Sequence, residues 1–289
     1  MELQAVLWGV LMPGLIAGIG ALLLVSRTSE SKGISLILLL ATLSFATGYI
    51  GLFGWPPLPS DSRTLAATDW LVWFILVAGV IQLFDDQLGR FAVFARWSIG
   101  GSMLYLIMRA TIEYQWEGAE VARWMAIIAL VGYALWRSLV GLADRVPSRS
   151  VLTILFCVFT GLAICSALTG SSKIAQMTGL FCSTLGAFVI VSWMKPLPKL
   201  RVGDITLFAL AAFGLGLCAL FYSELPVTEA LLITGGGVIP WIVELPYFRS
   251  WNDRKRGALR IVFVIAIVAV AVTRSALAFE SNPYGDYEY

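Results

Sequence analysis

The chain has 289 residues, of which 59% are hydrophobic and only 13% are charged, and its formal net charge is +2. Soluble proteins of this size carry about 25% charged residues, so the composition excludes a water-soluble globular protein. Apolar stretches long enough to cross a hydrocarbon core of about 30 Å recur from residue 5 to residue 279. We therefore predict an all-α, polytopic transmembrane helical bundle, in which residues 1–289 form a single integral membrane domain.

Charged residues, prolines and glycines divide the chain into ten predicted transmembrane helices. In chain order these are residues 5–25, 34–54, 69–84, 97–114, 121–142, 151–169, 173–194, 205–223, 228–247 and 258–279. The third helix is short, and residues 91–97 after it are expected to form an amphipathic turn at the membrane surface. Arginines lie inside or close to the ends of the fourth and fifth helices, at positions 109, 123 and 137.

The distribution of Lys and Arg predicts the orientation, because short loops rich in these residues stay in the cytoplasm during insertion. Fifteen of the twenty lie on the face that follows the odd-numbered helices, and the others are Arg63, Arg109, Arg123, Lys173 and Arg274. An error of one helix would mix the two groups, so the bias supports a count of ten. We expect both termini on the non-cytoplasmic side of a bacterial inner (plasma) membrane. Most Trp residues, including Trp97 and Trp136, fall near predicted helix ends, as an aromatic belt requires.

The two ends of the chain suggest different structures. Residues 1–4 include Glu2 and no basic residue, and no Ala-x-Ala-like cleavage site follows the first apolar stretch. We therefore expect a retained transmembrane helix there rather than a signal peptide. Residues 280–289 form a short acidic, Tyr-rich outer tail, for which a frayed end and a docking segment for a partner are both open.

The residue types that are missing exclude much familiar chemistry. The chain has no His, which excludes His-ligated haem, the usual zinc hydrolase sites and Ser-His or Cys-His nucleophile pairs. The cysteines lie inside predicted helices without the C-x-x-C spacing of a metal or redox site, at positions 157, 165, 182 and 218. We expect no cofactor, no metal and no nucleic acid. Membrane lipids are the expected partners, and membrane proteins remain an open alternative.

Carboxylates are the remaining candidates for catalysis. Asp204 follows Gly203, and Asp85 and Asp86 lie at the same predicted face of the membrane. Intramembrane aspartyl proteases pair two such acids, one of them in a Gly-x-Gly-Asp motif, and this chain is similar to them only in the Gly-Asp dipeptide, because Arg201 stands where the first glycine would be. The alternative is structural: Asp204 would be the N-cap of a helix that starts at residue 205, and the other two acids would end a helix at water.

The ninth predicted helix contains a strong helix-breaking pattern. Gly235, Gly236 and Gly237 precede Pro240, which lacks an amide hydrogen and clashes with the preceding turn of a helix. Transporters use such broken helices to expose backbone groups that bind a substrate or an ion. We name these four residues, with Glu244 one turn further on, as a candidate substrate-binding site. The alternative is that the glycines allow close packing and that the proline only kinks the helix.

Two further patterns have structural or surface interpretations. Gly14 and Gly18 form a G-x-x-x-G pattern, which is typical of a face where two helices pack closely. Arg254, Lys255 and Arg256 form a basic cluster beside the last helix, and they could bind anionic lipid headgroups or serve only to fix the orientation.

Three functions remain open on the sequence alone. The first is a transporter-like protein for a small or lipid-like solute, based on the glycine-rich break and on the lack of room for a soluble domain. The second is a non-catalytic subunit or scaffold of a larger membrane complex, based on the scarcity of ionisable residues inside the predicted helices. The third is a carboxylate-based membrane enzyme, although no recognisable catalytic motif favours an enzyme.

Overall fold

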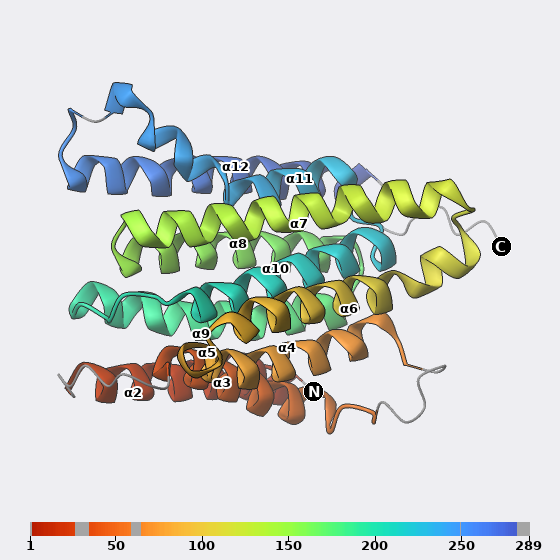
Figure 1. Ribbon diagram of the computed structural model, residues 1–289, viewed down its shortest axis with the longest axis horizontal. Coiled ribbons are helices and arrows are strands. Elements are labelled where there is room, and N and C mark those ends of the chain that lie inside the picture. The colour runs from red at the N-terminus through yellow and green to blue at the C-terminus, as the bar shows by residue number, and fades with distance from the viewer. Residues whose placement is uncertain (1, 27–34, 59–64, 249, 282–289) are drawn as a thin grey trace.

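The chain folds into a bundle of long helices that lie side by side and alternate in direction (Figure 1). The computed structural model describes residues 2–26, 35–58, 65–248 and 250–281, and every regular element in these ranges is a helix. Eight of these helices are long and apolar enough to cross a membrane, and two shorter apolar helices accompany them. The prediction of an all-α, polytopic transmembrane bundle is therefore confirmed.

The first half of the chain forms five antiparallel segments. The first segment is continuous from α1 (Glu2–Val6) through the π-helix η1 (Leu7–Leu11) to α2 (Met12–Ser26). The other segments and the short helix between the third and the fourth are α3 (Leu36–Phe53), α4 (Ala67–Leu83), α5 (Asp85–Leu88), α6 (Arg90–Tyr114) and α7 (Ala119–Arg145).

The second half contributes five more segments, one of which is broken. Its helices are α8 (Ser148–Leu168), α9 (Ser172–Met194), α10 (Val202–Tyr222), α11 (Val227–Gly236), the 3-10 helices η3 (Ile239–Glu244) and η4 (Pro246–Phe248), and α12 (Asp253–Ser281). At the standard rise per residue, α11 is about 15 Å long and η3 is about 12 Å long. Their summed length approaches the thickness of a hydrocarbon core. The two pieces therefore correspond to the ninth predicted helix.

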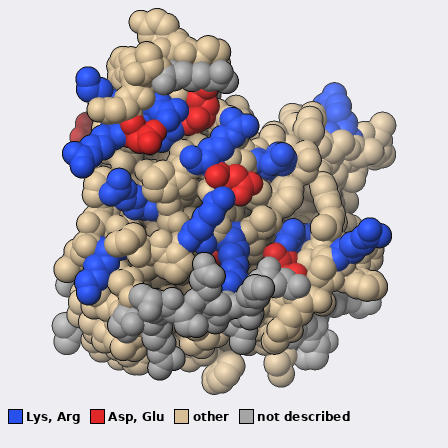
Figure 2. Space-filling model, turned by 60° about the vertical axis from the view of Figure 1, so that its left-hand side comes forward, with Lys and Arg blue, Asp and Glu red and all other residues tan. Residues whose placement is uncertain are grey.

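Lys and Arg gather at one end of the bundle (Figure 2). This end contains the ends of α7 and α9 and the starts of α6, α8 and α12 (Figure 1). We call it the basic end. Its described basic residues are Arg90, Arg96, Arg137, Arg145, Arg149, Lys195, Lys199, Arg201, Arg254, Lys255, Arg256 and Arg260. The predicted outer tail falls mainly on residues 282–289, which lie outside the described residues, as do positions 27, 32, 63 and 249.

Stacked phenylalanines form the centre of the core. Phe181 on α9 stacks on Phe45 of α3, with ring centroids 4.8 Å apart, and on Phe159 of α8 at 5.0 Å. It meets Phe208 of α10 edge to face. All four side chains are fully buried, so this cluster joins four helices by dispersion and aromatic packing.

The first segment contains a π-helical turn just before Pro13. The amide of Met12 donates to the carbonyl of Leu7, five residues back, and Ser183 of α9 donates its hydroxyl to the carbonyl of Val10. A β-carbon added at Gly14 would lie 2.9 Å from Oγ of Ser183, and Gly18 faces Ala187 one turn further along α9. The face predicted from the G-x-x-x-G pattern is thus the face that packs on α9.

The start of the fourth segment differs from the prediction. Residues 91–97 were expected to form a surface turn, and this is wrong, because α6 already begins at Arg90. Gly89, with φ of +51°, separates α5 from α6 in the left-handed conformation that glycine adopts without a steric penalty. The first turns of α6 contain basic residues and exposed Phe91 and Phe94. This mixed composition resembles a surface segment, so the sequence did not indicate that the long helix begins here.

The close packing of the first two segments can be tested at Gly48. A β-carbon at this position of α3 would lie 2.5 Å from Leu180, 2.7 Å from Pro13 and 3.0 Å from the backbone oxygen of Trp8. We expect Gly48→Ala to destabilise the protein by about 1–3 kcal/mol, because part of the clash is with backbone. The measurement is the apparent melting temperature of the purified protein in detergent. The control is Gly179→Ala on α9, where an added β-carbon meets nothing within 4 Å, and equal melting temperatures for the two variants would contradict the packing.

Candidate functional site

The predicted break in the ninth segment is present, and a neighbouring helix satisfies the backbone there. α11 ends at Gly236, and the chain continues through turns with hydrogen bonds between residues i and i−3. Pro240 cannot donate to the carbonyl of Gly237, three residues back, and Ser138 of α7 donates its hydroxyl to that carbonyl instead, at 3.3 Å. The indole of Trp241 returns a hydrogen bond to the backbone oxygen of Ser138, at 3.1 Å.

The glycines at this break approach neighbouring side chains closely. A β-carbon at Gly236 would lie 3.3 Å from Val158 of α8, and one at Gly237 would lie 2.6 Å from Leu135 of α7. Gly235 meets nothing within 4 Å. The structure therefore assigns packing contacts to two of the three glycines, and their role in substrate binding stays a prediction.

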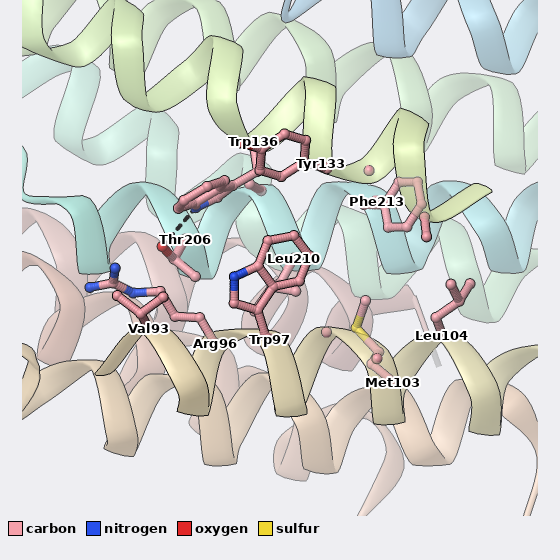
Figure 3. A pocket seen from close by; sticks show the side chains of 15 residues that line it. Val93, Arg96, Trp97, Met103, Leu104, Tyr133, Trp136, Thr206, Leu210 and Phe213 are labelled. Carbon is pink, nitrogen blue, oxygen red and sulfur yellow. Dashed lines mark hydrogen bonds between the residues drawn. The ribbon is translucent and has the colours of Figure 1, made fainter. Parts of the chain in front are cut away.

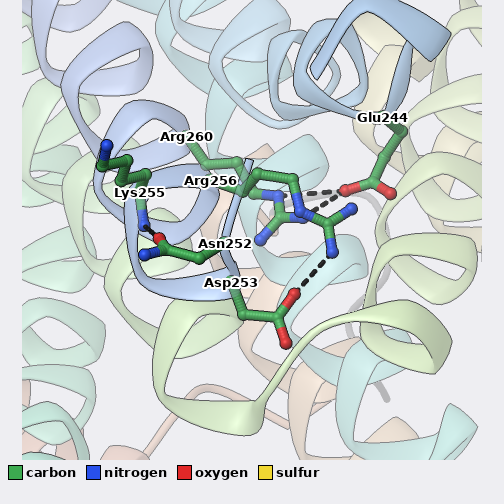
Figure 4. A network of polar contacts seen from close by, with 6 residues as sticks. All are labelled: Glu244, Asn252, Asp253, Lys255, Arg256 and Arg260. Carbon is green, nitrogen blue, oxygen red and sulfur yellow. Dashed lines mark hydrogen bonds and ion pairs between the residues drawn. The ribbon is translucent and has the colours of Figure 1, made fainter. Parts of the chain in front are cut away.

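Glu244 forms an ion pair at the basic end. Both Nε and a terminal nitrogen of Arg260 donate to one of its carboxylate oxygens, the former at 3.1 Å (Figure 4). Both side chains are largely buried. The pair joins the end of η3 to α12, so it fixes the broken segment to the last helix.

The three residues of the basic cluster have different surroundings. Arg254 and Lys255 are exposed, and Arg256 donates to Asp253 at 2.5 Å (Figure 4). The backbone amide of Lys255 donates to the side chain of Asn252, which caps the start of α12. The structure contains nothing that tests lipid binding at these residues, so that assignment stays a prediction.

Two of the candidate catalytic acids, Asp204 and Asp85, are held by partners, and the side chain of Asp86 lies outside the described residues. Asp204 is only 1% exposed, and its carboxylate accepts hydrogen bonds from the hydroxyl of Ser35 and, at 2.8 Å, from the backbone amide of Arg201. The prediction that Asp204 is an N-cap is wrong in register. α10 begins at Val202, so Asp204 is its third residue and folds back to the cap residue, as in a capping box. Asp85 forms an ion pair with Arg96 of α6.

A cavity of about 210 Å³ lies between α6, α7 and α10, away from the broken segment. None of Gly235, Gly236, Gly237, Pro240 and Glu244 lines it. The wall residues are mainly apolar and aromatic (Figure 3), and they are Val93, Arg96, Trp97, Gly100, Gly101, Met103, Leu104, Ala129, Gly132, Tyr133, Trp136, Thr206, Ala209, Leu210 and Phe213.

The cavity has a buried floor and a mouth on the surface of the bundle. Met103 and Ala209 at the floor are 1% and 3% exposed, whereas Trp97 at the mouth is 58% exposed. Trp97 of α6 stacks on Tyr133 of α7, with ring centroids 5.5 Å apart, and Tyr133 lies beside Trp136. α6 and α7, whose side chains flank the mouth, are both long and apolar enough to span a membrane.

The two ends of the cavity differ in polarity. Arg96 lies at one end, together with the hydrogen bond from the indole of Trp136 to Thr206, and Met103, Leu104 and Phe213 lie toward the other (Figure 3). The guanidinium of Arg96 donates through Nε to the side-chain oxygen of Gln82 at 3.1 Å and through a terminal nitrogen to Asp85. The cavity is therefore amphiphilic, with its charged end toward the basic end of the bundle.

Comparison with models of known protein families and with curated proteins finds no match for this chain. The fold and the site define it as a polytopic α-helical membrane protein with an amphiphilic cavity between spanning helices. Sequence reasoning missed this cavity. The available signals were Gly100 and Gly101 on α6 and Gly132 on α7, which remove side chains from facing walls, and the aromatic residues nearby.

The buried pair of Glu244 and Arg260 leads to a stability prediction. We expect Glu244→Gln to lower the stability by about 3–5 kcal/mol, because it leaves a buried guanidinium without its counter-charge. The control is Asp253→Asn, which breaks the neighbouring pair with Arg256 at a carboxylate that is 89% exposed, and which should cost about 1 kcal/mol or less. Thermal unfolding in detergent measures both variants. A Glu244→Gln protein as stable as the Asp253→Asn protein would show that the pair contributes little.

Proposed function

We propose that this protein is transporter-like and binds a lipid-like solute in the cavity between α6, α7 and α10. The observation that carries this proposal is an aromatic-lined cavity whose mouth lies on the surface of the bundle and whose floor is buried among helices long and apolar enough to span a membrane. A hydrophobic solute dissolved in the bilayer could enter there sideways without crossing water.

The size of the cavity limits the solute. An engineered protein cavity of about 150 Å³ holds benzene, and pockets for drug-sized ligands are about 300–1,000 Å³. A volume of about 210 Å³ therefore suits one hydrocarbon chain or one ring rather than a two-chain lipid. Binding from water would be favoured by about 25 cal/mol for each Å² of apolar surface that is buried. A solute that is already dissolved in lipid gains less from this burial. Packing against the aromatic walls therefore has to supply the selectivity.

The subunit or scaffold function is less well supported than binding of a solute. A scaffold requires no cavity, whereas Gly100 and Gly101 leave open space in the cavity wall, where an added β-carbon meets no atom closer than 3.8 Å. An aspartyl enzyme gains little support, because Asp204 accepts two hydrogen bonds from protein donors and Asp85 is paired with Arg96.

The proposed binding can be tested by filling the cavity at Gly101. A β-carbon at this position meets nothing within 4 Å, so Gly101→Leu adds a side chain to the cavity wall without a clash at its β-carbon. We expect this variant to lose at least about tenfold in affinity for a single-chain amphiphile such as dodecanoate, which corresponds to about 1.4 kcal/mol of lost contact. Radiolabelled dodecanoate binding to protein in phosphatidylcholine nanodiscs measures the affinity, after subtraction of partitioning into protein-free nanodiscs.

The matched control for this experiment is Gly179→Leu on α9, which also introduces a leucine at a helical glycine with open space around it but does not line the cavity. It should bind dodecanoate like the unmodified protein. Equal binding by the two variants would place the solute elsewhere and remove the support for this site. Melting temperatures establish that both variants are folded.

The orientation also belongs to the proposal: the basic end faces the cytoplasm, and both termini face the opposite side. We expect a cysteine at Glu117, in the exposed turn between α6 and α7, to react with a membrane-impermeant maleimide on intact spheroplasts. A cysteine at Lys199, which is exposed at the basic end, should react only after permeabilisation. A variant without the four native cysteines provides the background, and the reverse labelling pattern would invert the topology.

A further inference from the structure

We infer that the solute is a single-chain anionic amphiphile, whose acidic head is bound by Arg96 and whose hydrocarbon chain lies along the cavity toward Leu104 and Phe213. This inference rests on the proposed function, and it adds the chemical class of the solute and the residue that recognises it. The head is a carboxylate, as in a fatty acid, or a phosphate, as in an alkyl or isoprenoid phosphate.

The position of Arg96 in the wall supports a charged head at one end only. The opposite end of the cavity carries Met103, Leu104 and Phe213, so it can accept only an apolar group (Figure 3). A long chain with its acid at Arg96 would therefore run away from the basic end toward the middle of the bundle. This is also the orientation of a lipid whose head is at the membrane surface. The planar guanidinium presents several N–H groups in a fork that fits carboxylate and phosphate oxygens.

Asp85 is the protein's own carboxylate partner of Arg96, in the role that we propose for the acidic head of the solute. Its carboxylate forms an ion pair with Arg96 and comes from α5, a helix of four residues between Phe84 and Gly89. The cavity lining belongs to α6, α7 and α10 and does not include Asp85, which is held by a short connecting element rather than by the bundle. An acidic head at Arg96 would compete with this carboxylate for the same guanidinium.

Gln82 contacts Arg96 from outside the cavity lining and adds a second observation. Its side-chain oxygen accepts from Arg96, which fixes the orientation of the amide, and its amide nitrogen is buried with no hydrogen-bond partner among the described residues. A buried donor without an acceptor is uncommon and often marks the place of a water or ligand atom. The amide nitrogen of Gln82, beside Arg96, is thus a donor that lacks an acceptor, which suits an oxygen-rich anionic head.

The experiment compares three ligands of equal chain length in phosphatidylcholine nanodiscs: dodecanoate, dodecyl phosphate and dodecanol. We expect the unmodified protein to bind the two acids at least about tenfold more tightly than the alcohol, because hydrogen bonds to charged groups contribute about 1.5–3 kcal/mol. Arg96→Gln should remove this preference, so that the two acids bind no more tightly than dodecanol. The tighter of the two acids distinguishes a carboxylate head from a phosphate head.

Asp85→Asn provides the test of opposite sign. It removes the competing charge while keeping an acceptor for Arg96, so the affinity for both acids should rise, whereas a purely structural ion pair predicts lower stability with no gain in affinity. This variant and the ligand comparison keep the inference testable even where Arg96→Gln does not fold. If the unmodified protein binds the two acids and the alcohol equally, and Gly101→Leu still blocks all three, the proposal of an anionic head is wrong. The cavity would then remain the binding site. Failure of Gly101→Leu to reduce binding would instead overturn the proposed function, and the inference with it.

Discussion

Backbone polar groups inside a membrane must find partners within the protein, because hydrocarbon offers no water to satisfy them. The two irregular segments of this bundle follow from that constraint. Pro13 is preceded by a π-helical turn, and Pro240 lies in a 3-10 helix. At the first turn the hydroxyl of Ser183 binds a backbone carbonyl, and at the second the hydroxyl of Ser138 does so. Each serine comes from a neighbouring helix, so the distortions also determine which helices lie together.

Charged groups follow the same rule at the ends of the helices. Glu244 is paired with Arg260, Glu229 with Arg274 at 2.8 Å, and Asp204 with donors from Ser35 and Arg201. These partners either come from distant positions in the sequence or belong to the start of a helix. Pairing of this kind allows charged side chains to lie near hydrocarbon. The pair formed by Arg96 and Asp85 differs in one respect, because Arg96 also lines the cavity. It is therefore a charge pair that a solute could reach.

The sequence predicted the spans well because hydropathy and the Lys and Arg bias are properties of single segments. The break at Gly235–Pro240 was also predictable, since proline and glycine act locally. The start of α6 was misplaced, because Arg90, Phe91 and Phe94 gave that turn the composition of a surface segment. Asp204 was misplaced by the same kind of error, because a helix start depends on backbone hydrogen bonds that residue types indicate only approximately.

The cavity could not be predicted, because it exists only where three helices meet. Gly100 and Gly101 lie more than 25 residues before Gly132, and Thr206 comes much later on α10. Trp97 and Trp136 were assigned to an aromatic belt by their position near helix ends, and nothing in the sequence indicates that Trp97 and Trp136 both contact Tyr133. Which helix faces lie against each other depends on the packing of side chains that are far apart in the sequence. A local sequence pattern does not indicate this packing.

The cavity and the broken segment are connected through α7. Tyr133 and Trp136 line the cavity, and Ser138, half a turn beyond Trp136, exchanges two hydrogen bonds with the break around Pro240. Movement of α7 would strain the two hydrogen bonds of Ser138, which compensate for the amide hydrogen that Pro240 lacks. Two hydrogen bonds hold this segment less firmly than the hydrogen bonds of a continuous helix would. The cavity wall and the break around Pro240 are thus joined through hydrogen bonds of one helix, α7.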